Sequence, residues 1–252
     1  MLEILILSVI QGVTEFIPIS SSSHLILISS YLDFENQNLS IDVSLHIGSF
    51  FAVLFYFRND VLNFLKNKDL FFKIFFSSIP VMCAGYILIE FDLIHFLRNL
   101  EIIGWTTIIF GVLLFLSDKS KRKNKIDKDF NYKSAILIGF FQALSLIPGV
   151  SRSGITITSG RMLGFNRFDS AKISFFLSIP TLAAASVVGI YSIYREGSAE
   201  LNFLAIVAVI FSFIFSYVTI AFFFSFIKKF NLNIFIIYRI ALSLFILGIV
   251  YL

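Results

Sequence analysis

Long apolar stretches recur along the whole chain and are separated by short polar segments. An α-helix needs roughly 20 apolar residues to cross a bilayer. Stretches that approach this length cover residues 41–57, 74–91, 102–117, 172–194, 202–227 and 234–252. Strand-like alternation is absent, and lipid accommodates only helices or closed barrels as spanning structures. The pattern therefore predicts an all-α polytopic membrane protein with six transmembrane helices.

Two other apolar regions are each interrupted near the middle by a polar loop. Residues 2–32 are split by QGVTEFIPISSSSH, and residues 134–165 are split by PGVSRSG. The apolar stretches on either side of each break are too short to cross the membrane. Both regions therefore favour a re-entrant helix–loop–helix hairpin, whose non-helical loop is buried in protein or lines a wet cavity.

The two predicted hairpins share an order of features that indicates an internal repeat. Each contains a glutamine, then a proline beside a serine-rich loop: Gln11 and Pro18 in the first, Gln142 and Pro148 in the second. Three predicted spans follow each hairpin, so one membrane domain, residues 1–252, is expected to contain halves 1–117 and 134–252. A hairpin adds no crossing and three spans add an odd number, so the second half is expected to be inverted.

Loop charges set the predicted orientation. The linker of residues 118–133 is rich in basic residues, and by the positive-inside rule it is a cytoplasmic loop. These residues are Lys119, Lys121, Arg122, Lys123, Lys125, Lys128 and Lys133. Alternation of the spans then places both termini outside, with the first hairpin entering from outside and the second from the cytoplasm. The two polar loops are expected to meet near the middle of the membrane.

Composition narrows the class of protein further. Of the 252 residues, 58% are hydrophobic and 14% are charged, against about 25% charged in a soluble domain. The basic loops explain the formal net charge of +4, so no nucleic-acid partner is expected. Cys83 is the single cysteine, which leaves no disulfide framework.

Ionisable and hydroxyl side chains gather at the two predicted loops. Glu15 and His24 are expensive groups to place in lipid, and Arg152 is their expected counter-charge. An ion pair that only ties the hairpins together is the alternative, but it would not require the surrounding serines. These are Ser20, Ser21, Ser22, Ser23, Ser145, Ser151 and Ser153. Hydroxyls and free amides at a helix start bind anions, and a guanidinium matches phosphate oxygens, so a lipid phosphate or pyrophosphate site is predicted.

The first loop also contains candidates for metal binding and catalysis. Gln11 and Glu15 lie one helical turn apart, and their oxygens suit Mg²⁺ or Ca²⁺; a polar pair without a metal is the alternative. Ser21 or Ser22 is a candidate nucleophile, with His24 as general acid or base. Attack by Ser21, by His24 or by an activated water stays open at this point.

The stretch QGVTEFIPISSSSH resembles the (E/Q)-x-x-x-E-F-x-P-x-S-S-x-x-H motif of the bacitracin-resistance family of undecaprenyl-pyrophosphate phosphatases. PGVSRSG resembles the second motif of that family, and the likeness extends over the whole chain. The resemblance implies hydrolysis of undecaprenyl pyrophosphate to undecaprenyl phosphate and inorganic phosphate. It also implies a bacterial cytoplasmic membrane location, a site opening to the outer face, and recycling of the lipid carrier for cell-wall synthesis.

Roles for individual residues follow from the matching motif positions. The resemblance implies that the catalytic residues are Glu15, Ser21, His24 and Arg152, and that the substrate-binding residues are Gln11, Ser20, Ser22, Ser151, Ser153 and Gly154. A divalent cation, Mg²⁺ or Ca²⁺, would sit at Gln11 and Glu15. Two positions depart from the commonest pattern: the first acidic position is Gln11, which the motif admits, and Ser23 stands where the family often has glycine.

Two other classes of protein share parts of this pattern. A polyprenyl-phosphate lipid transporter or flippase is the alternative, because inverted repeats with broken helices are also a transporter architecture. It does not need His24 or a serine three residues before it. A phosphatase of the phosphatidic-acid type needs a downstream histidine, and none follows Arg152. A homodimer is among the expected assemblies.

Three polar residues outside the motifs receive structural interpretations. Asp42 and His46 lie one turn apart at the outer end of a span, which favours an interfacial hydrogen-bonded pair over a substrate role. Arg239 begins the last span, so it is expected to snorkel towards the cytoplasmic surface.

Overall fold

The computed structural model describes residues 1–32, 34, 39–119, 123–196 and 199–251. In these residues the chain is almost entirely helical, and its one β feature is an isolated bridge between Asn124 and Phe165. The helices are α1 Leu2–Thr14, α2 Ser21–Leu32, α3 Leu39–Tyr56, α4 Arg58–Lys66, α5 Lys68–Glu90, α6 Ile94–Leu97, α7 Leu100–Asp118, α8 Ile126–Asp129, α9 Tyr132–Ala143, the 3₁₀-helix η1 Leu144–Leu146, α10 Arg152–Met162, α11 Arg167–Glu196, α12 Ala199–Ile227 and α13 Asn233–Tyr251.

Five helices in the described residues are long and apolar enough to cross a membrane. They are α5, α7, α11, α12 and α13. A sixth span arises if α3 and α4 are taken together, although the chain bends by 79° between them. This agrees with a polytopic all-helical membrane protein. The apolar segments Leu2–Thr14 and Tyr132–Leu146 are shorter, and both lie in the regions predicted to form hairpins.

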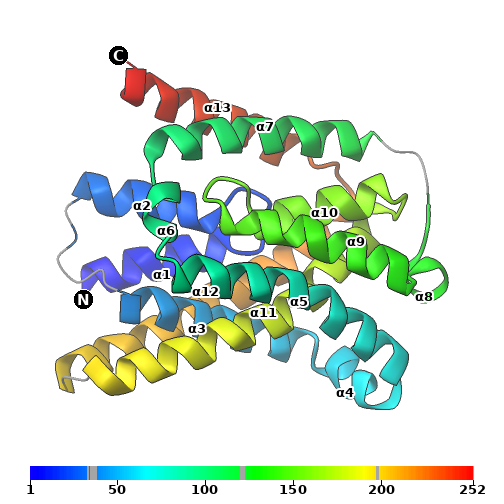
Figure 1. Ribbon diagram of the computed structural model, residues 1–252, viewed down its shortest axis with the longest axis horizontal. Coiled ribbons are helices and arrows are strands. Elements are labelled where there is room, and N and C mark those ends of the chain that lie inside the picture. The colour runs from blue at the N-terminus through cyan, green and yellow to red at the C-terminus, as the bar shows by residue number, and fades with distance from the viewer. Residues whose placement is uncertain (33, 35–38, 120–122, 197–198, 252) are drawn as a thin grey trace.

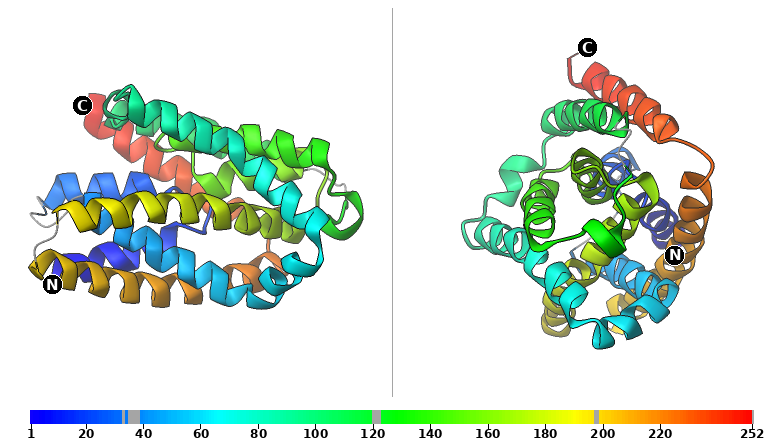
Figure 2. Two further views of the ribbon diagram at one scale, coloured as in Figure 1. Left: turned by 60° about the horizontal axis from the view of Figure 1, so that its bottom comes forward. Right: turned by 90° about the vertical axis from the view of Figure 1, so that its right-hand side faces the viewer.

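The helices lie along a common long axis, and the two interrupted regions enter from opposite ends. Figure 1 shows α1 and α2 at one end and α9 and α10 at the other, with their connecting loops meeting in the middle. The N- and C-termini lie at one end of the bundle, whereas α4 and α8 lie at the other (Figure 2). Residues Ser153–Arg161 of α10 are all buried, so this short helix is enclosed by the rest of the protein.

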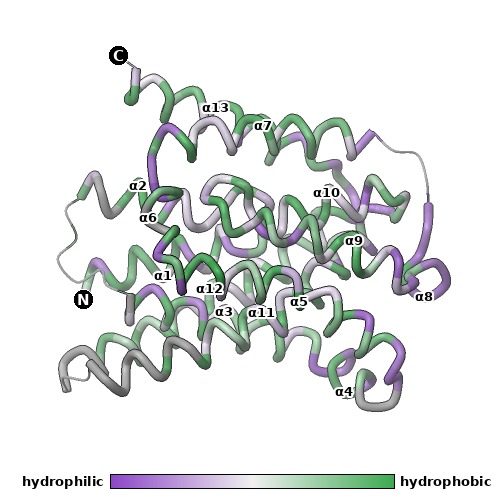
Figure 3. Tube along the Cα trace, in the orientation of Figure 1, coloured by the Kyte–Doolittle hydropathy of each residue, from purple (hydrophilic) through white to green (hydrophobic). Residues whose placement is uncertain are grey.

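The end that carries α4 and α8 is the more polar one (Figure 3). Ion pairs tie the helices there. Arg167 Nε lies 2.7 Å from Asp118 Oδ1, and Lys172 Nζ lies 2.8 Å from Asp60 Oδ1. Part of the basic linker belongs to the same end, although Lys121 and Arg122 lie outside the described residues. The basic segments predicted to share one side of the membrane are therefore found at one end of the molecule.

Each interrupted region packs against a long helix from the other predicted half. Helix α1 contacts α12, and α9 contacts α5. Both contacts use a glycine: an added Cβ at Gly12 would meet the main chain of α12, and one at Gly139 would meet the main chain of α5. Close approach through small residues is typical of helices packed in lipid. Each predicted half thus packs its interrupted region against a long helix of the other half. The internal repeat itself stays a prediction.

Helices α3 and α12 also pack closely. An added Cβ at Gly48 would meet the backbone of Val209 and Phe213. Ser49 Oγ lies 2.9 Å from Ser216 Oγ across the same interface. Gly48 allows the two helices to approach closely, and buried hydroxyls such as that of Ser49 form hydrogen bonds between helices in lipid. The two contacts together fix the separation of α3 and α12.

We expect Gly48→Ala to destabilise the protein by about 1–3 kcal/mol, because the new methyl group would push against main-chain atoms that cannot rotate away. The measurement is the thermal unfolding midpoint in detergent. Gly248→Ala is the matched control: nothing lies within 4 Å of an added Cβ there, and the change should leave the midpoint unchanged or raise it. Equal midpoints for both variants would contradict the packing described for α3 and α12.

Candidate active site

The first loop connects α1 to α2 over residues 15–20. Pro18 lacks a backbone N–H, so the helix cannot continue through it. The backbone of Ser20 has φ 78°, a left-handed conformation that costs a residue with a side chain roughly 1–2 kcal/mol. Helix α2 begins at the next residue, Ser21. The break in the apolar pattern is therefore a compact turn that delivers Ser21 at the start of a helix.

The second loop has the same construction. After η1, the chain passes Pro148 and Gly149, and Ser151 has φ 69° immediately before α10 begins at Arg152. The Ser151 hydroxyl accepts a hydrogen bond from the backbone N–H of Gly154 at 3.2 Å, which caps α10. Two half-helices thus begin in the middle of the protein, each preceded by a serine in the left-handed region. Helix N-termini with free N–H groups favour anions.

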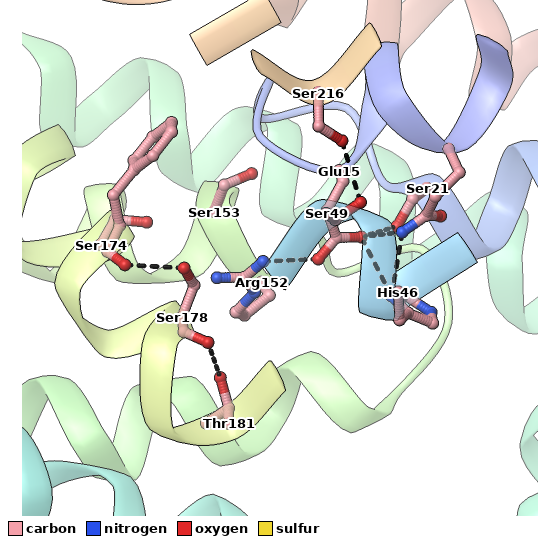
Figure 4. A network of polar contacts seen from close by, with 12 residues as sticks. Glu15, Ser21, His46, Ser49, Arg152, Ser153, Ser174, Ser178, Thr181 and Ser216 are labelled. Carbon is pink, nitrogen blue, oxygen red and sulfur yellow. Dashed lines mark hydrogen bonds and ion pairs between the residues drawn. The ribbon is translucent and has the colours of Figure 1, made fainter. Parts of the chain in front are cut away.

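The Glu15 carboxylate is the centre of the contacts between the loops (Figure 4). Its Oε1 pairs with Arg152 Nη2 at 2.5 Å. Its Oε2 accepts hydrogen bonds from the Ser21 hydroxyl at 2.7 Å and from Gln11 Nε2 at 3.0 Å. The Glu15 side chain is 6% exposed, so removal of this carboxylate from water is offset by three donors and one positive charge.

This arrangement brings together most of the residues predicted from sequence. Ser153 Oγ donates to the carbonyl of Ile17 at 3.0 Å and joins the second loop to the first. Ser20 Oγ lies 2.9 Å from Ser23 Oγ and 3.3 Å from Ser22 Oγ. The Ser21 hydroxyl and the Arg152 guanidinium bind different oxygens of the Glu15 carboxylate. In this arrangement the hydroxyl can attack phosphorus while the guanidinium holds phosphate oxygens.

His24 takes a different place from the cluster around Glu15. Its Nδ1 lies 2.6 Å from the carbonyl oxygen of Ser20, and its Nε2 lies 2.6 Å from the hydroxyl of Tyr238 on α13. The imidazole and phenol rings are stacked with 5.6 Å between centroids and 9° between planes. Tyr238 carried no signal in the sequence motifs, because it belongs to an apolar helix distant in the chain.

The structure corrects the interpretation of His46 as an interfacial residue away from the substrate pocket. Its Nδ1 lies 2.9 Å from Gln11 Nε2 and 3.8 Å from Glu15 Oε2. The reason is tertiary: α3 packs against α1, so the first turns of α3 face Gln11 and Glu15. His46 therefore borders the candidate site.

Arg239 is also placed differently from the expectation. It is 0% exposed and does not snorkel. Its guanidinium donates to the carbonyl of Pro18 in the first loop at 3.2 Å and to those of Gly149 and Val150 in the second at 2.8 and 3.2 Å. It also donates to the carbonyl of Thr107 on α7. One side chain thus satisfies main-chain oxygens that the interrupted helices leave unpaired.

Gln11 and Glu15, the residues expected to hold a divalent cation, are buried side by side. Gln11 Oε1 is buried and has no hydrogen-bond partner among the described residues, and it lies on the side chain that contacts the Glu15 carboxylate. No group of three or more His, Cys, Asp or Glu side chains that could hold a metal ion is found in the described part of the chain. An orphaned amide oxygen beside one carboxylate fits Mg²⁺ or Ca²⁺ when substrate and water supply the remaining oxygens.

Comparison with known proteins gives matches along almost the whole chain. The family described as "Bacitracin resistance protein BacA" matches residues 4–245. A protein of Pelagibacter ubique (strain HTCC1062) named undecaprenyl-diphosphatase is 49% identical over 251 residues, which cover 99% of this chain and 98% of that protein. Another of that name from Erythrobacter litoralis (strain HTCC2594) is 35% identical over 276 residues and 96% of each chain.

We expect Arg239→Lys to lower the free energy of unfolding by about 3 kcal/mol or more. An ammonium group is a single point of charge and cannot donate to carbonyls of both loops and α7 at once, so several buried acceptors would lose their partners. The thermal unfolding midpoint measures the loss. Arg58→Lys is the matched control, because Arg58 is exposed and, among the described residues, its hydrogen bond goes to the carbonyl of Phe55 three positions earlier. An unaltered midpoint in Arg239→Lys would refute the role given to this side chain.

Proposed function

Because the chain belongs to the family described as bacitracin resistance protein BacA, we infer that it hydrolyses undecaprenyl pyrophosphate to undecaprenyl phosphate and inorganic phosphate. The enzyme is therefore a membrane hydrolase that recycles the lipid carrier used in cell-wall synthesis. One observation carries this proposal: the hydroxyl of Ser21 and the guanidinium of Arg152 meet on the two oxygens of the Glu15 carboxylate. That combination supplies a nucleophile, its base and a phosphate clamp.

The proposed reaction is a double displacement at the terminal phosphorus. Ser21 Oγ attacks this phosphorus while Glu15 takes the hydroxyl proton, and the bond between the phosphorus and the bridging oxygen breaks. Undecaprenyl phosphate leaves, and the terminal phosphoryl group remains on Ser21. The proton on Glu15 then passes to the departing undecaprenyl phosphate, so the carboxylate is free again. Water attacks the phosphoserine while Glu15 accepts a proton from it, the bond between the phosphorus and Ser21 Oγ breaks, and Glu15 returns that proton to the serine oxygen as inorganic phosphate is released. Nucleophilic catalysis of this kind divides one difficult step into two easier ones.

Charge on the transferring phosphoryl group needs donors that are already in place. Arg152 supplies a planar fork beside the attacking hydroxyl, and the backbone N–H groups at the starts of α2 and α10 add further donors. Ser22, Ser151 and Ser153 border these helix starts. Arg152 is paired with Glu15, and we propose that phosphate binding draws the guanidinium partly away and leaves the carboxylate free to take the proton.

A divalent cation is part of the proposal. Gln11 and Glu15 would hold it, with Gln11 turning its unpaired oxygen towards the ion. Bound there, the cation would neutralise pyrophosphate oxygens and help to orient them. With one carboxylate in the pair, most of its ligands would come from substrate and water, which is how Mg²⁺ is often bound.

We also propose how the helices are arranged in the membrane. Six spans and two re-entrant hairpins, α1–α2 and α9–α10, account for the two loops that meet in the middle of the bundle (Figure 1). The basic end is assigned to the cytoplasm, which places both termini outside in the bacterial cytoplasmic membrane. Ser22, the second residue of α2, is exposed. Helix α2 runs from the loop towards the end of the termini (Figure 1), which supports access from the outer face.

The transporter alternative gains no specific support. A carrier would also use inverted hairpins and a positive side chain for a lipid phosphate. It gives no reason for a serine hydroxyl to be bonded to a buried carboxylate. Both named relatives are diphosphatases. The possible homodimer stays a prediction.

We expect Ser21→Ala and Arg152→Lys each to reduce phosphate release from a polyprenyl pyrophosphate by at least about a hundredfold, because each removes a group that acts mainly in the transition state. The assay is inorganic phosphate release by detergent-purified protein. Ser225→Ala is the control for Ser21, since Ser225 is exposed in the last turn of α12. Full activity in folded Ser21→Ala would exclude Ser21 as the nucleophile.

We expect EDTA to abolish activity and added Mg²⁺ or Ca²⁺ to restore it. Gln11→Glu should then lower the cation concentration required for half-maximal activity, because a second carboxylate increases the affinity of oxygen ligands for a hard cation. The titration is run on wild-type and variant protein after dialysis against EDTA. Activity that survives complete chelation would remove the cation from the proposal.

A further inference from the structure

We propose that His24 and Tyr238 form a positioning pair that fixes the start of α2, and that His24 takes no direct part in the chemical steps. This inference rests on the proposed phosphatase function, whose chemistry it refines. It distinguishes between Ser21 and His24, the two side chains of the first motif that could attack phosphorus. The geometry points to Ser21 with Glu15, because both ring nitrogens of His24 are already engaged.

The hydrogen-bond partners define the state of the imidazole ring. The carbonyl of Ser20 can only accept, so His24 Nδ1 must carry the hydrogen in their 2.6 Å contact. In the neutral ring Nε2 then accepts from the hydroxyl of Tyr238, also at 2.6 Å. With His24 only 9% exposed and its ring stacked on the phenol, neither nitrogen is directed at the Ser21–Glu15 pair.

The bond to Ser20 has a consequence for Ser21. The carbonyl of Ser20 and the N–H of Ser21 belong to one planar peptide group. No cis peptide bond occurs in the described residues, so the N–H points away from the oxygen that His24 holds. His24 therefore sets both the direction of the Ser21 N–H at the start of α2 and the position of its Cα.

The conformation of Ser20 explains why such a clamp is needed. With φ 78°, Ser20 occupies a region that a residue with a side chain adopts only when its surroundings enforce it. His24 supplies part of that enforcement from one turn further along α2. Tyr238 holds His24 in turn, and its neighbour Arg239 holds the carbonyls of both loops. Consecutive residues of α13 thus fix the first loop at two points, Arg239 at Pro18 directly and Tyr238 at Ser20 through His24.

Replacement of His24 by asparagine or glutamine separates a positioning role from a chemical one. The amide nitrogen of asparagine lies at nearly the same distance from the backbone as Nδ1, whereas that of glutamine reaches the position of Nε2. His24→Asn should keep kcat within about tenfold of the wild type, since one donor to Ser20 is retained. His24→Gln and His24→Ala should lose about a hundredfold or more in kcat, with KM nearly unchanged because Arg152 still binds phosphate.

Tyr238→Phe tests the second half of the pair while retaining the stacked ring. We expect it to lower kcat about tenfold through the lost hydrogen bond, and to have no further effect in the His24→Asn background, where the amide cannot reach Tyr238. Tyr251→Phe, on the same helix, is the control: its hydroxyl contacts only Trp105 and Glu101 among the described residues, and activity should be unaltered.

Two kinetic results would overturn the inference. One is a His24→Asn variant as inactive as His24→Ala while its unfolding midpoint equals that of the wild type, which would make His24 a chemical participant. The other is an equal effect of Tyr238→Phe in both backgrounds. If the wild type and Tyr251→Phe themselves release no phosphate, the proposed function fails instead.

A spectroscopic readout tests the pair independently of turnover. In protein labelled with ¹⁵N-histidine, which has three histidines, the signals of His24 are assigned by their loss in His24→Asn. We expect Nδ1 to be the protonated nitrogen and Nε2 the bare one, with the Nε2 signal moving in Tyr238→Phe. A His24 ring protonated at Nε2 alone would contradict the assignment even if the enzyme were fully active.

Discussion

The structure depends on one constraint: a helix interrupted inside a membrane leaves main-chain carbonyls that water cannot reach. Arg239 meets this constraint for both loops at once, because its guanidinium donates to Pro18, Gly149 and Val150. The fork of donors that makes arginine suited to phosphate is here used on backbone oxygens. Without it, these buried carbonyls would lose their donor, and the facing helix starts would be held together only by the Arg152–Glu15 pair and the bond from Ser153 to Ile17 among the contacts described above.

The site contains a second compensation, between charges. Arg152 is attracted to Glu15 across the two loops, and Ser21 and Gln11 complete the carboxylate's hydrogen bonds. These donors hold the Glu15 carboxylate in position. A guanidinium also binds phosphate groups strongly, so a bound phosphate would compete with Glu15 for Arg152. In the proposed mechanism, substrate binding and activation of the serine are coupled through this ion pair.

Sequence patterns predicted the helical class, the approximate spans and the polar loops, because hydrophobic length and serine-rich breaks are local features. They also predicted Glu15, Ser21 and Arg152, which occur in two short motifs. His46 and Arg239 were misjudged because a single polar residue near the end of an apolar helix looks the same whether it faces the interface or the interior. Only the packing of α3 on α1, and of α13 against α7, decides between these cases. Tyr238 gave no local signal at all.

In the proposed mechanism Ser21 attacks phosphorus and is transiently phosphorylated. The stereochemical course at the terminal phosphorus tests it most directly, with a polyprenyl pyrophosphate analogue made chiral at that atom by isotopes and sulfur. Two successive in-line displacements each invert the configuration, so the account predicts overall retention in the released thiophosphate. Overall inversion would mean a single displacement by water, and would contradict the nucleophilic role of Ser21 even if Glu15 and Arg152 were essential.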